Sequence, residues 1–169
     1  MNEVTARETW EFVQRARIED TLKDYCHYVD RNDPDGIVGQ VFCADGCFEL
    51  GSRHAVVGHD QLRLMFAKTL AAFSMTSHHL SNVKVRFTGE DSAESTAYVY
   101  AWHLAVEDGR RIDLWGRYHD RLRLTAQGWR IASRRLIVAG TDGWLDPPFE
   151  LPERLPNPVD PPSPRIEKR

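Results

Sequence analysis

Histidine and aspartate side chains are the residues of this chain best suited to moving protons. His78 and His103 fall in segments rich in Val, Tyr, Trp and Leu, and Asp30 follows the apolar stripe of a long helical segment. The pKa of an imidazole lies near neutrality, so a histidine can both accept and return a proton. A carboxylate that is hydrogen-bonded to one ring nitrogen of a histidine fixes the tautomer of the ring and stabilises its imidazolium form. An Asp and a His brought together would therefore suit acid–base chemistry.

Alternation along strands restricts how these histidines can act. His78 and His79 are neighbours, so on a strand they point to opposite faces and cannot chelate one metal ion together. His103 shares its face with Val99 and Ala101. We therefore expect one of the adjacent histidines to face a cavity and the other a core or an interface.

The elements that position these residues follow from hydrophobic periodicity. The segment 8–31 lacks Gly and Pro and repeats apolar residues at helical spacing, and two shorter helices are expected at 34–42 and 58–73. Turn clusters separate the later segments, which are typical of strands. The expected strands are 47–50, 76–87, 93–106, 112–124 and 129–138.

Helices followed by long strands predict an α+β fold, with a curved antiparallel sheet packed against three N-terminal helices. If the long helix crosses the concave face, the two layers enclose an apolar pocket. The expected domain covers residues 1–145. Eight of the nine prolines lie at Pro147 or beyond, which predicts an extended tail at 146–169. Around the junction of the domain and this tail, Trp144, Leu145 and Phe149 are expected to dock.

Composition and charge limit the classes of partner that the protein is expected to bind. The net charge of the 169 residues is −3, and no basic block precedes the extreme C-terminus, so we expect neither nucleic acid nor a membrane as a partner. The first residues show no hydrophobic signal region, and a cytoplasmic location is expected. The three cysteines Cys26, Cys43 and Cys47 have no paired spacing and are predicted to be free thiols.

Several short motifs, taken in order, resemble the SnoaL-like superfamily, which includes polyketide cyclases, ketosteroid isomerase and scytalone dehydratase. They are Arg17-Ile18-Glu19-Asp20, Gly58-His59-Asp60-Gln61-Leu62, Thr76-Ser77-His78-His79-Leu80-Ser81-Asn82 and Gly128-Trp129-Arg130-Ile131. The resemblance spans about residues 7–138. It implies the cone-shaped α+β fold of the nuclear-transport-factor-like proteins, and within it the branch of scytalone dehydratase and hexachlorocyclohexane dehydrochlorinase.

The resemblance also implies site residues. The family's Asp near the end of the first helix and His at the start of the second strand match Asp30 and His78. A second histidine of scytalone dehydratase matches His103, and Tyr25 matches a tyrosine of bile-acid 7α-dehydratase. These relatives use no cofactor and no metal, so we expect none here. A metal held by Asp30, His78 and His103 is the formal alternative.

The same register implies the residues that would contact substrate. They are Cys26, Phe48, Thr76, Val99, Ala101, Leu114, Gly116, Tyr118, Arg134 and Val138. Ala101 and Gly116 are small and would leave space for a ligand. The sequence departs from scytalone dehydratase at Val29, where that enzyme has Tyr, and from the dehydrochlorinase at Tyr25, where that enzyme has Lys. The second difference argues against halide elimination.

The leading hypothesis is a cofactor-independent dehydratase acting on a hydrophobic cyclic metabolite, such as a polyketide, a steroid or an aromatic precursor. His78 would be the general base oriented by Asp30, with His103 and Tyr25 assisting the leaving group and a carbonyl. The alternatives are an isomerase or cyclase using the same pair, a non-catalytic binding module, and the small subunit of a ring-hydroxylating dioxygenase. A homotrimer is expected, with a dimer as the alternative.

Overall fold

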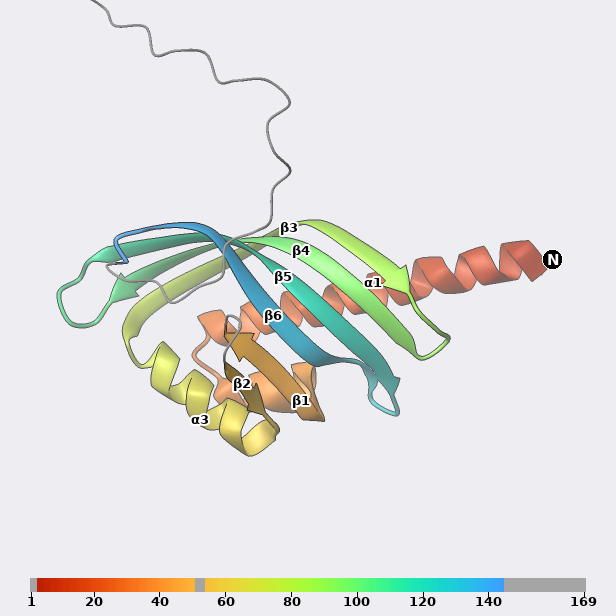
Figure 1. The fold of residues 1–169 in the computed structure, drawn as a ribbon, viewed down its shortest axis with the longest axis horizontal. Coiled ribbons are helices and arrows are strands. Elements are labelled where there is room, and N and C mark those ends of the chain that lie inside the picture. The colour runs from red at the N-terminus through yellow and green to blue at the C-terminus, as the bar shows by residue number, and fades with distance from the viewer. Residues whose placement is uncertain (1–2, 51–53, 145–169) are drawn as a thin grey trace, which may run out of the picture.

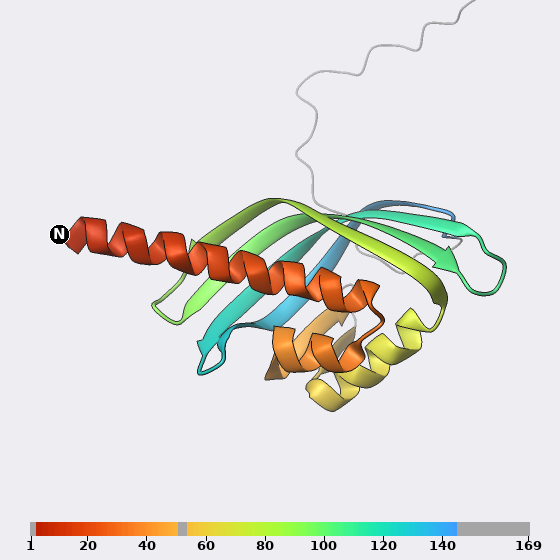
Figure 2. The ribbon, with the colours of Figure 1, turned by 180° about the vertical axis from the view of Figure 1, so that it is seen from behind.

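The computed structural model describes residues 3–50 and 54–144. A strongly curved sheet arches over the shorter helices, and the long first helix runs across one of its faces (Figures 1 and 2). The elements in chain order are α1 (Glu3–Asp30), α2 (Pro34–Gly36), the π-helical turn η1 (Ile37–Val41), β1 (Phe42–Leu50), β2 (His54–Val57), α3 (His59–Leu70), β3 (Phe73–Phe87), β4 (Ser92–Ala105), β5 (Arg111–Thr125) and β6 (Gly128–Asp142).

Helix α1 is held to the sheet along most of its length. Ile18, Leu22 and Val29 recur at helical spacing and are buried, and the helix packs against β3 and β6. The first turns project beyond the sheet (Figure 2), and contact with it begins at Trp10, whose ring packs against β3. This packing fixes the C-terminal end of α1, where Asp30 lies.

The expected second helix is a short α-helical turn followed by a π-helical turn. Asp33 caps it, because its Oδ1 accepts a hydrogen bond from the Gly36 amide at 2.8 Å, and Pro34 occupies the first turn. Ile37, Val38 and Val41 of η1 are all buried. The wider turn thus presents three apolar side chains to the core within five residues.

The sheet is mixed, whereas the sequence pattern predicted an antiparallel one. Its strand order is β2-β1-β6-β5-β4-β3, and every neighbouring pair is antiparallel except β1 and β6, which are parallel. No hairpin joins β1 to β6, so the long intervening chain leaves a parallel pairing open to them. Strand β2 was not predicted.

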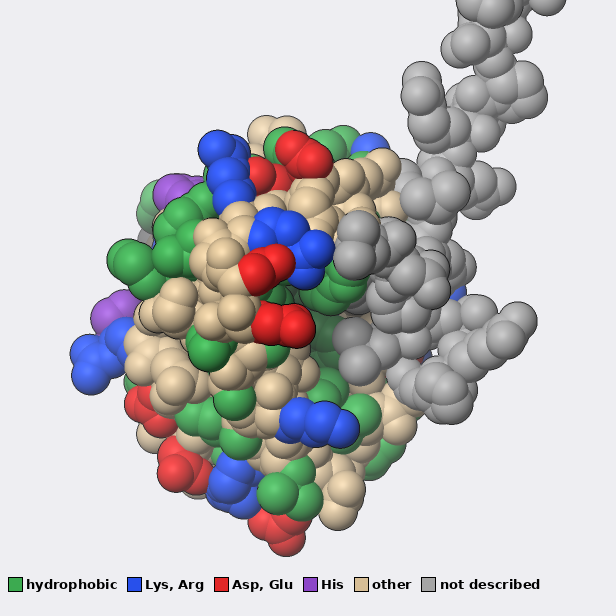
Figure 3. All heavy atoms as spheres, turned by 90° about the vertical axis from the view of Figure 1, so that its left-hand side faces the viewer, with side chains coloured by type: hydrophobic (Ala, Val, Ile, Leu, Met, Phe, Trp, Pro, Cys, Tyr) green, Lys and Arg blue, Asp and Glu red, His purple; other side chains and the backbone are tan. Residues whose placement is uncertain are grey.

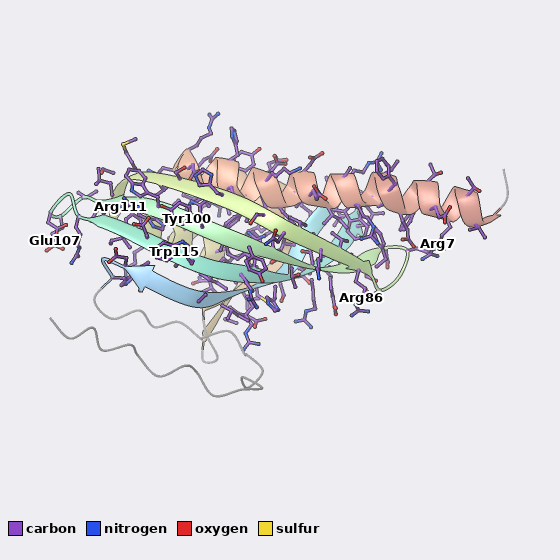
Figure 4. The ribbon with its side chains drawn as sticks, turned by 90° about the horizontal axis from the view of Figure 1, so that it is seen from above. Arg7, Arg86, Tyr100, Glu107, Arg111 and Trp115 are labelled. Carbon is purple, nitrogen blue, oxygen red and sulfur yellow. The ribbon has the colours of Figure 1, made fainter. Side chains whose placement is uncertain are left out.

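The sheet separates an inner face from an outer one. Along β4 every second residue from Ala93 to Ala105 is buried. The inner residues join α1, η1 and α3 in one apolar core. On the outer face Tyr100 of β4 stacks on Trp115 of β5 with ring centroids 5.7 Å apart (Figure 4). The inner face is therefore where a buried site can form.

The surface at the end that carries the turn between β4 and β5 mixes apolar, acidic and basic side chains (Figure 3). Within residues 3–50 and 54–144, no helix has the length and apolarity that a membrane crossing requires. The expected tail at 146–169, the domain boundary at 145 and the docking of Leu145 and Phe149 lie outside the described residues. Trp144 is described, and it packs against the core.

Candidate active site

Asp30, the last residue of α1, holds the beginning of β3 through three hydrogen bonds. Its Oδ1 accepts from His78 Nδ1 at 2.7 Å and from Thr76 Oγ1 at 2.8 Å, and its Oδ2 accepts from the His78 amide at 2.9 Å. The His78 side chain is 7% exposed and that of Asp30 is 29% exposed. A carboxylate accepts only, so Nδ1 of His78 carries a proton and Nε2 is left for the cavity that His78 lines.

These contacts keep Asp30 ionised. Partial burial alone would raise the pKa of Asp30, but the hydrogen bonds from the His78 side chain and amide, together with that from Thr76, outweigh it and lower the pKa below its usual value. The carboxylate is therefore a fixed negative charge beside the His78 ring. Such a charge stabilises an imidazolium when the ring gains a proton.

His103 of β4 lies next to His78, with ring centroids 5.3 Å apart and the rings perpendicular. Burial, followed by the proximity of His78, lowers the pKa of His103 to about 4, so its ring is neutral at pH 7. Its Nδ1 lies 3.3 Å from the Ile112 carbonyl oxygen, which can only accept a hydrogen bond. The proton is therefore on Nδ1, and Nε2 of His103 is a hydrogen-bond acceptor.

The two histidines line an apolar cavity of about 120 Å³ between α1, α3 and the inner face of the sheet. An engineered apolar cavity of roughly 150 Å³ holds one benzene molecule, so the space suits about one carbocyclic ring. The lining residues are Tyr25, Val29, Phe48, Met65, Phe66, Thr69, Leu70, Phe73, His78, Ala101, His103, Leu114, Tyr118, Leu136 and Trp144.

Two tyrosines bring hydroxyl groups into this otherwise apolar lining. Burial raises the pKa of Tyr25 to about 12, with the Arg134 charge acting against it, and burial also raises the pKa of Tyr118. Both hydroxyls stay protonated at neutral pH and can act as donors.

Behind the tyrosines lies a completely buried ion pair. Arg134 of β6 donates from Nε and Nη2 to the two carboxylate oxygens of Asp120 on β5, both at 2.8 Å. Its guanidinium carbon lies 4.2 Å from the ring centroid of Tyr25 and 4.1 Å from that of Tyr118. Burial alone would lower the pKa of Arg134, but the Asp120 carboxylate raises it above its usual value. The pair therefore fixes both rings.

The structure brings seven of the sequence-predicted residues to the cavity wall: Tyr25, Phe48, His78, Ala101, His103, Leu114 and Tyr118. Asp30 lies behind His78, and Thr76 binds Asp30 rather than facing the cavity. The catalytic and substrate-binding roles of all these residues stay predictions.

The remaining predicted substrate contacts lie outside the lining. Cys26, Val99, Gly116, Arg134 and Val138 are all buried, but none of them lines the cavity. Arg134 is removed from it because its guanidinium lies against the rings of Tyr25 and Tyr118, and burial raises the pKa of the Cys26 thiol to about 12. At Gly116 a Cβ atom would lie 2.8 Å from the Ile137 carbonyl oxygen, so the missing side chain serves the close approach of two strands.

Several lining residues were missed by the sequence prediction. Met65, Phe66, Thr69 and Leu70 share one side of α3, and the apolar spacing of that helix was a signal for them. Leu136 and Trp144 gave no comparable signal, because their place depends on the curvature of β6 and on the turn after it. Among the described residues, no group of three His, Cys, Asp or Glu side chains, Asp30, His78 and His103 included, is arranged to hold a metal ion.

Solved structures share this fold. A candidate scytalone dehydratase from Novosphingobium aromaticivorans superposes with a TM-score of 0.83 at 23% identity, covering 88% of this chain and 99% of the other. A candidate aromatic ring hydroxylase from the same species is 31% identical, with a TM-score of 0.74 and coverage of 81% and 97%. A type 2 hexachlorocyclohexane dehydrochlorinase is 15% identical, with a TM-score of 0.73 and coverage of 80% and 91%.

Sequence comparison gives the family. No curated protein matches the chain. The profile of the SnoaL-like domain matches residues 10–135, which include Asp30, both cavity histidines and the buried ion pair. The three helices and the curved mixed sheet agree with the cone fold that the resemblance implied. The chain therefore belongs to the SnoaL-like domain family.

Proposed function

We propose that the protein is a cofactor-independent dehydratase that removes water from a cyclic, mostly apolar β-hydroxy carbonyl compound. The observation that carries the proposal is the Asp30–His78 hydrogen bond of 2.7 Å at the wall of a small apolar cavity. Candidate dehydratase and dehydrochlorinase proteins among the solved structures agree with elimination chemistry. Among the expected substrate classes, polyketides and aromatic precursors supply single rings with suitable substituents, whereas the fused rings of a steroid exceed a cavity of about 120 Å³.

His78 acts as the general base. With Nδ1 donated to Asp30, its Nε2 takes the proton from the carbon next to the carbonyl group, and Asp30 stabilises the imidazolium that forms. The electron pair of the broken C–H bond passes into the carbonyl group of the substrate and gives an enolate. It then forms the carbon–carbon double bond as the C–O bond to the hydroxyl group breaks.

The departing hydroxyl group takes its proton from the His78 imidazolium and leaves as water, which returns His78 to its resting form. The structure favours this over proton donation from His103. At pH 7 the His103 ring is neutral, because its pKa is lowered to about 4, and its one proton points to the Ile112 carbonyl. Nε2 of His103 instead accepts a hydrogen bond from the substrate hydroxyl and orients it.

Tyr25 stabilises the charge that develops on the carbonyl oxygen. Burial raises the pKa of the Tyr25 hydroxyl to about 12, so the group keeps its proton at neutral pH and can donate a hydrogen bond to the substrate. The nearby Arg134 adds a positive charge. Donors fixed before the reaction stabilise an oxyanion in a dry site far more than they would in water.

Loss of His78 tests the proposal. A panel of cyclic β-hydroxy ketones beginning with 3-hydroxycyclohexanone is assayed for enone formation by absorbance. We expect His78→Ala to lower kcat by roughly 10²- to 10⁴-fold, the usual value of a positioned base. The matched control is His79→Ala, since His79 is exposed and stacks on Tyr100 of the outer face. Full activity in His78→Ala, or equal losses in the two variants, would reject the proposal.

The same dyad could move a proton without loss of water, as in an isomerase or cyclase. The protonated Tyr25 hydroxyl at the cavity wall favours this second reaction equally, because both reactions pass through an enolate. Product mass separates them: dehydration lowers the mass by one water, and isomerisation leaves it unchanged.

A third candidate belongs to a different class. The 31% identical structure is described as a candidate aromatic ring hydroxylase, which favours a subunit of such an enzyme or a binding module. Under this hypothesis the Asp30–His78 pair has no catalytic role, and the purified chain turns over no member of the panel. Binding of a cyclic ketone that survives in the Asp30→Asn/His78→Ala double variant would support it.

A further inference from the structure

The environment of the His103 ring depends on a residue beyond the last strand. Phe73 of β3 lies against this ring with centroids 4.5 Å apart, and His78 lies at 5.3 Å. The indole of Trp144 adds a third side, with its ring at 79° to the imidazole and centroids 6.5 Å apart. Trp144 thus completes an aromatic enclosure around one of the two cavity histidines.

The turn that delivers Trp144 admits only glycine. Gly143 has φ of +76°, a conformation that side chains disfavour, and a Cβ atom there would lie 2.2 Å from the Arg111 carbonyl oxygen at the start of β5. The chain leaving β6 is therefore held against β5. This close approach directs the next side chain, Trp144, to the cavity wall and the core.

Other walls of the cavity belong to regular elements. Tyr25 and Phe66 are on helices, and Leu114 is on a central strand, so each packs on several layers of the core. Trp144 follows the last strand and is only partly buried. A change at Trp144 can therefore alter the cavity without removing a core residue.

We propose that Trp144, seated by the turn at Gly143, is the residue that determines substrate size, closing the cavity beside His103 so that only single-ring substrates fit. The proposal rests on the proposed function for the nature of the substrate, but its test measures binding and titration rather than turnover. A cavity of about 120 Å³ has room for one ring and not for two fused ones. Removing the indole should open space for the second ring.

The test uses the full chain and two probes, phenol and 2-naphthol, with the ring signals of His78 and His103 followed by NMR. Wild type should bind phenol and exclude 2-naphthol. Trp144→Ala should bind 2-naphthol at least roughly ten-fold more tightly than wild type, a difference of about 1.4 kcal/mol. Trp144→Phe should lie between them. Equal 2-naphthol affinity in wild type and Trp144→Ala would overturn the proposal.

A second readout does not depend on a ligand. The charged and titratable groups that act on His103 are His78, Asp30 and Asp113, and none of them changes in these variants. Exposure to water in Trp144→Ala should therefore raise the pKa of His103 from about 4 towards 6.5. An unchanged titration would show that Trp144 does not enclose His103.

Gly143→Ala tests the role of the turn separately, because it keeps the Trp144 indole but strains the turn that positions it. It should weaken the discrimination against 2-naphthol and raise the pKa of His103 in the same direction as Trp144→Ala. If only Trp144→Ala has these effects, the role assigned to Gly143 is wrong. The matched control is Trp10→Ala, because Trp10 packs on Phe87 outside the cavity and its loss should leave both readouts unchanged.

These measurements separate the two proposals. If His78→Ala keeps full activity while Trp144→Ala admits 2-naphthol, the dehydratase proposal fails and the size limit stands. If His78→Ala is inactive and Trp144→Ala leaves 2-naphthol binding unchanged, the size limit fails and the dehydratase proposal stands.

Discussion

Asp30 carries out several tasks with one carboxylate. It orients His78, fixes the amide of the same residue and holds Thr76, so α1 and β3 are joined at the place where chemistry is proposed. A carboxylate that accepts three hydrogen bonds favours its charged form. The catalytic pair and the junction of two elements are thus one structure, and loss of the charge affects both.

The lowered pKa of Asp30 makes a prediction for acid stability. A carboxyl group whose pKa is lower in the folded than in the unfolded state adds stability above its unfolded pKa, near 3.9, and this stability is lost as pH falls through the folded value. Asp30→Asn should therefore be less stable than wild type at pH 7, and the gap should close below about pH 4. Urea unfolding at several pH values measures the difference in free energy of unfolding between wild type and Asp30→Asn. A difference that stays constant with pH would contradict the prediction.

The lowered pKa of His103 predicts a second pH dependence of stability, in a higher pH range than that of Asp30. Its folded pKa of about 4 lies below the unfolded value near 6.5, so the unfolded state binds more protons between these limits. The part of the free energy of unfolding that depends on His103 should have its full value above about pH 6.5. It should fall towards pH 4, by up to about 1.4 kcal/mol per pH unit. His103→Leu should flatten this slope, whereas His119→Leu on the outer face should keep it.

Sequence reasoning placed both cavity histidines on strands but could not pair them. Strand parity put His103 on the face of Ala101, and that face is the inner one. The distance between His78 and His103 depends on the register in which Thr76 pairs with His103 and His78 with Ala101. Such a register follows from the packing of the whole sheet, so only the resemblance to known enzymes indicated it in advance.

At the scale of elements, the Asp120–Arg134 pair couples β5 to β6 beneath the two tyrosines. The two residues are direct partners in the register of these strands, and both side chains are completely buried. Removing one member of such a pair leaves a charge without water or partner. The positions of Tyr25 and Tyr118, which line the cavity, therefore depend on β5 and β6 together.

Asp120→Asn should lower the free energy of unfolding by about 3–5 kcal/mol, because Arg134 would then be buried without a counter-ion. The matched control is Glu94→Gln, which breaks the exposed pair of Glu94 with Arg86 and should cost under about 1 kcal/mol. Chemical denaturation measures both. Similar costs in the two variants would show that burial of the Asp120 pair adds nothing.

The elements themselves were more predictable than the way they combine. The expected segments 76–87, 93–106 and 112–124 differ from β3, β4 and β5 by at most a few residues, because long alternating runs are a strong signal. The parallel pairing of β1 with β6 was not predicted, since it depends on contacts between residues such as Phe42 and Ile131 that lie far apart in sequence. Local patterns contain no information about such a partner.

At the scale of the molecule, the outer face of the sheet has the character of an interface. Tyr98 is 43% exposed and Trp115 is 45% exposed, and the latter stacks on Tyr100 (Figure 4). Exposed aromatic side chains gathered on one face mark surfaces that bind other proteins. The inner face is already covered by α1 and α3, so the outer face is the one available for a second copy.

We expect the protein to be a homotrimer in solution, and size-exclusion chromatography with light scattering measures its mass. Trp115→Glu places a charge in the aromatic cluster and should shift the mass towards that of the monomer, 19.4 kDa. Arg7→Glu, on the projecting end of α1 (Figure 4), is the control and should leave the mass unchanged. A wild-type monomer would contradict the expectation, and a dimer would replace the trimer.

The strand order has a consequence for synthesis on the ribosome. β6 lies between β1 and β5, so the last of the described strands to be made fills a central position that the earlier strands leave open. Until residues 128–142 emerge, β1 and β5 lack their shared neighbour, and Tyr25 lacks the Arg134 that packs against it. Pairing of β1 with β6 spans most of the chain, and contacts of such long separation form slowly. The growing chain therefore acquires its cavity only after residues 128–142 have been translated.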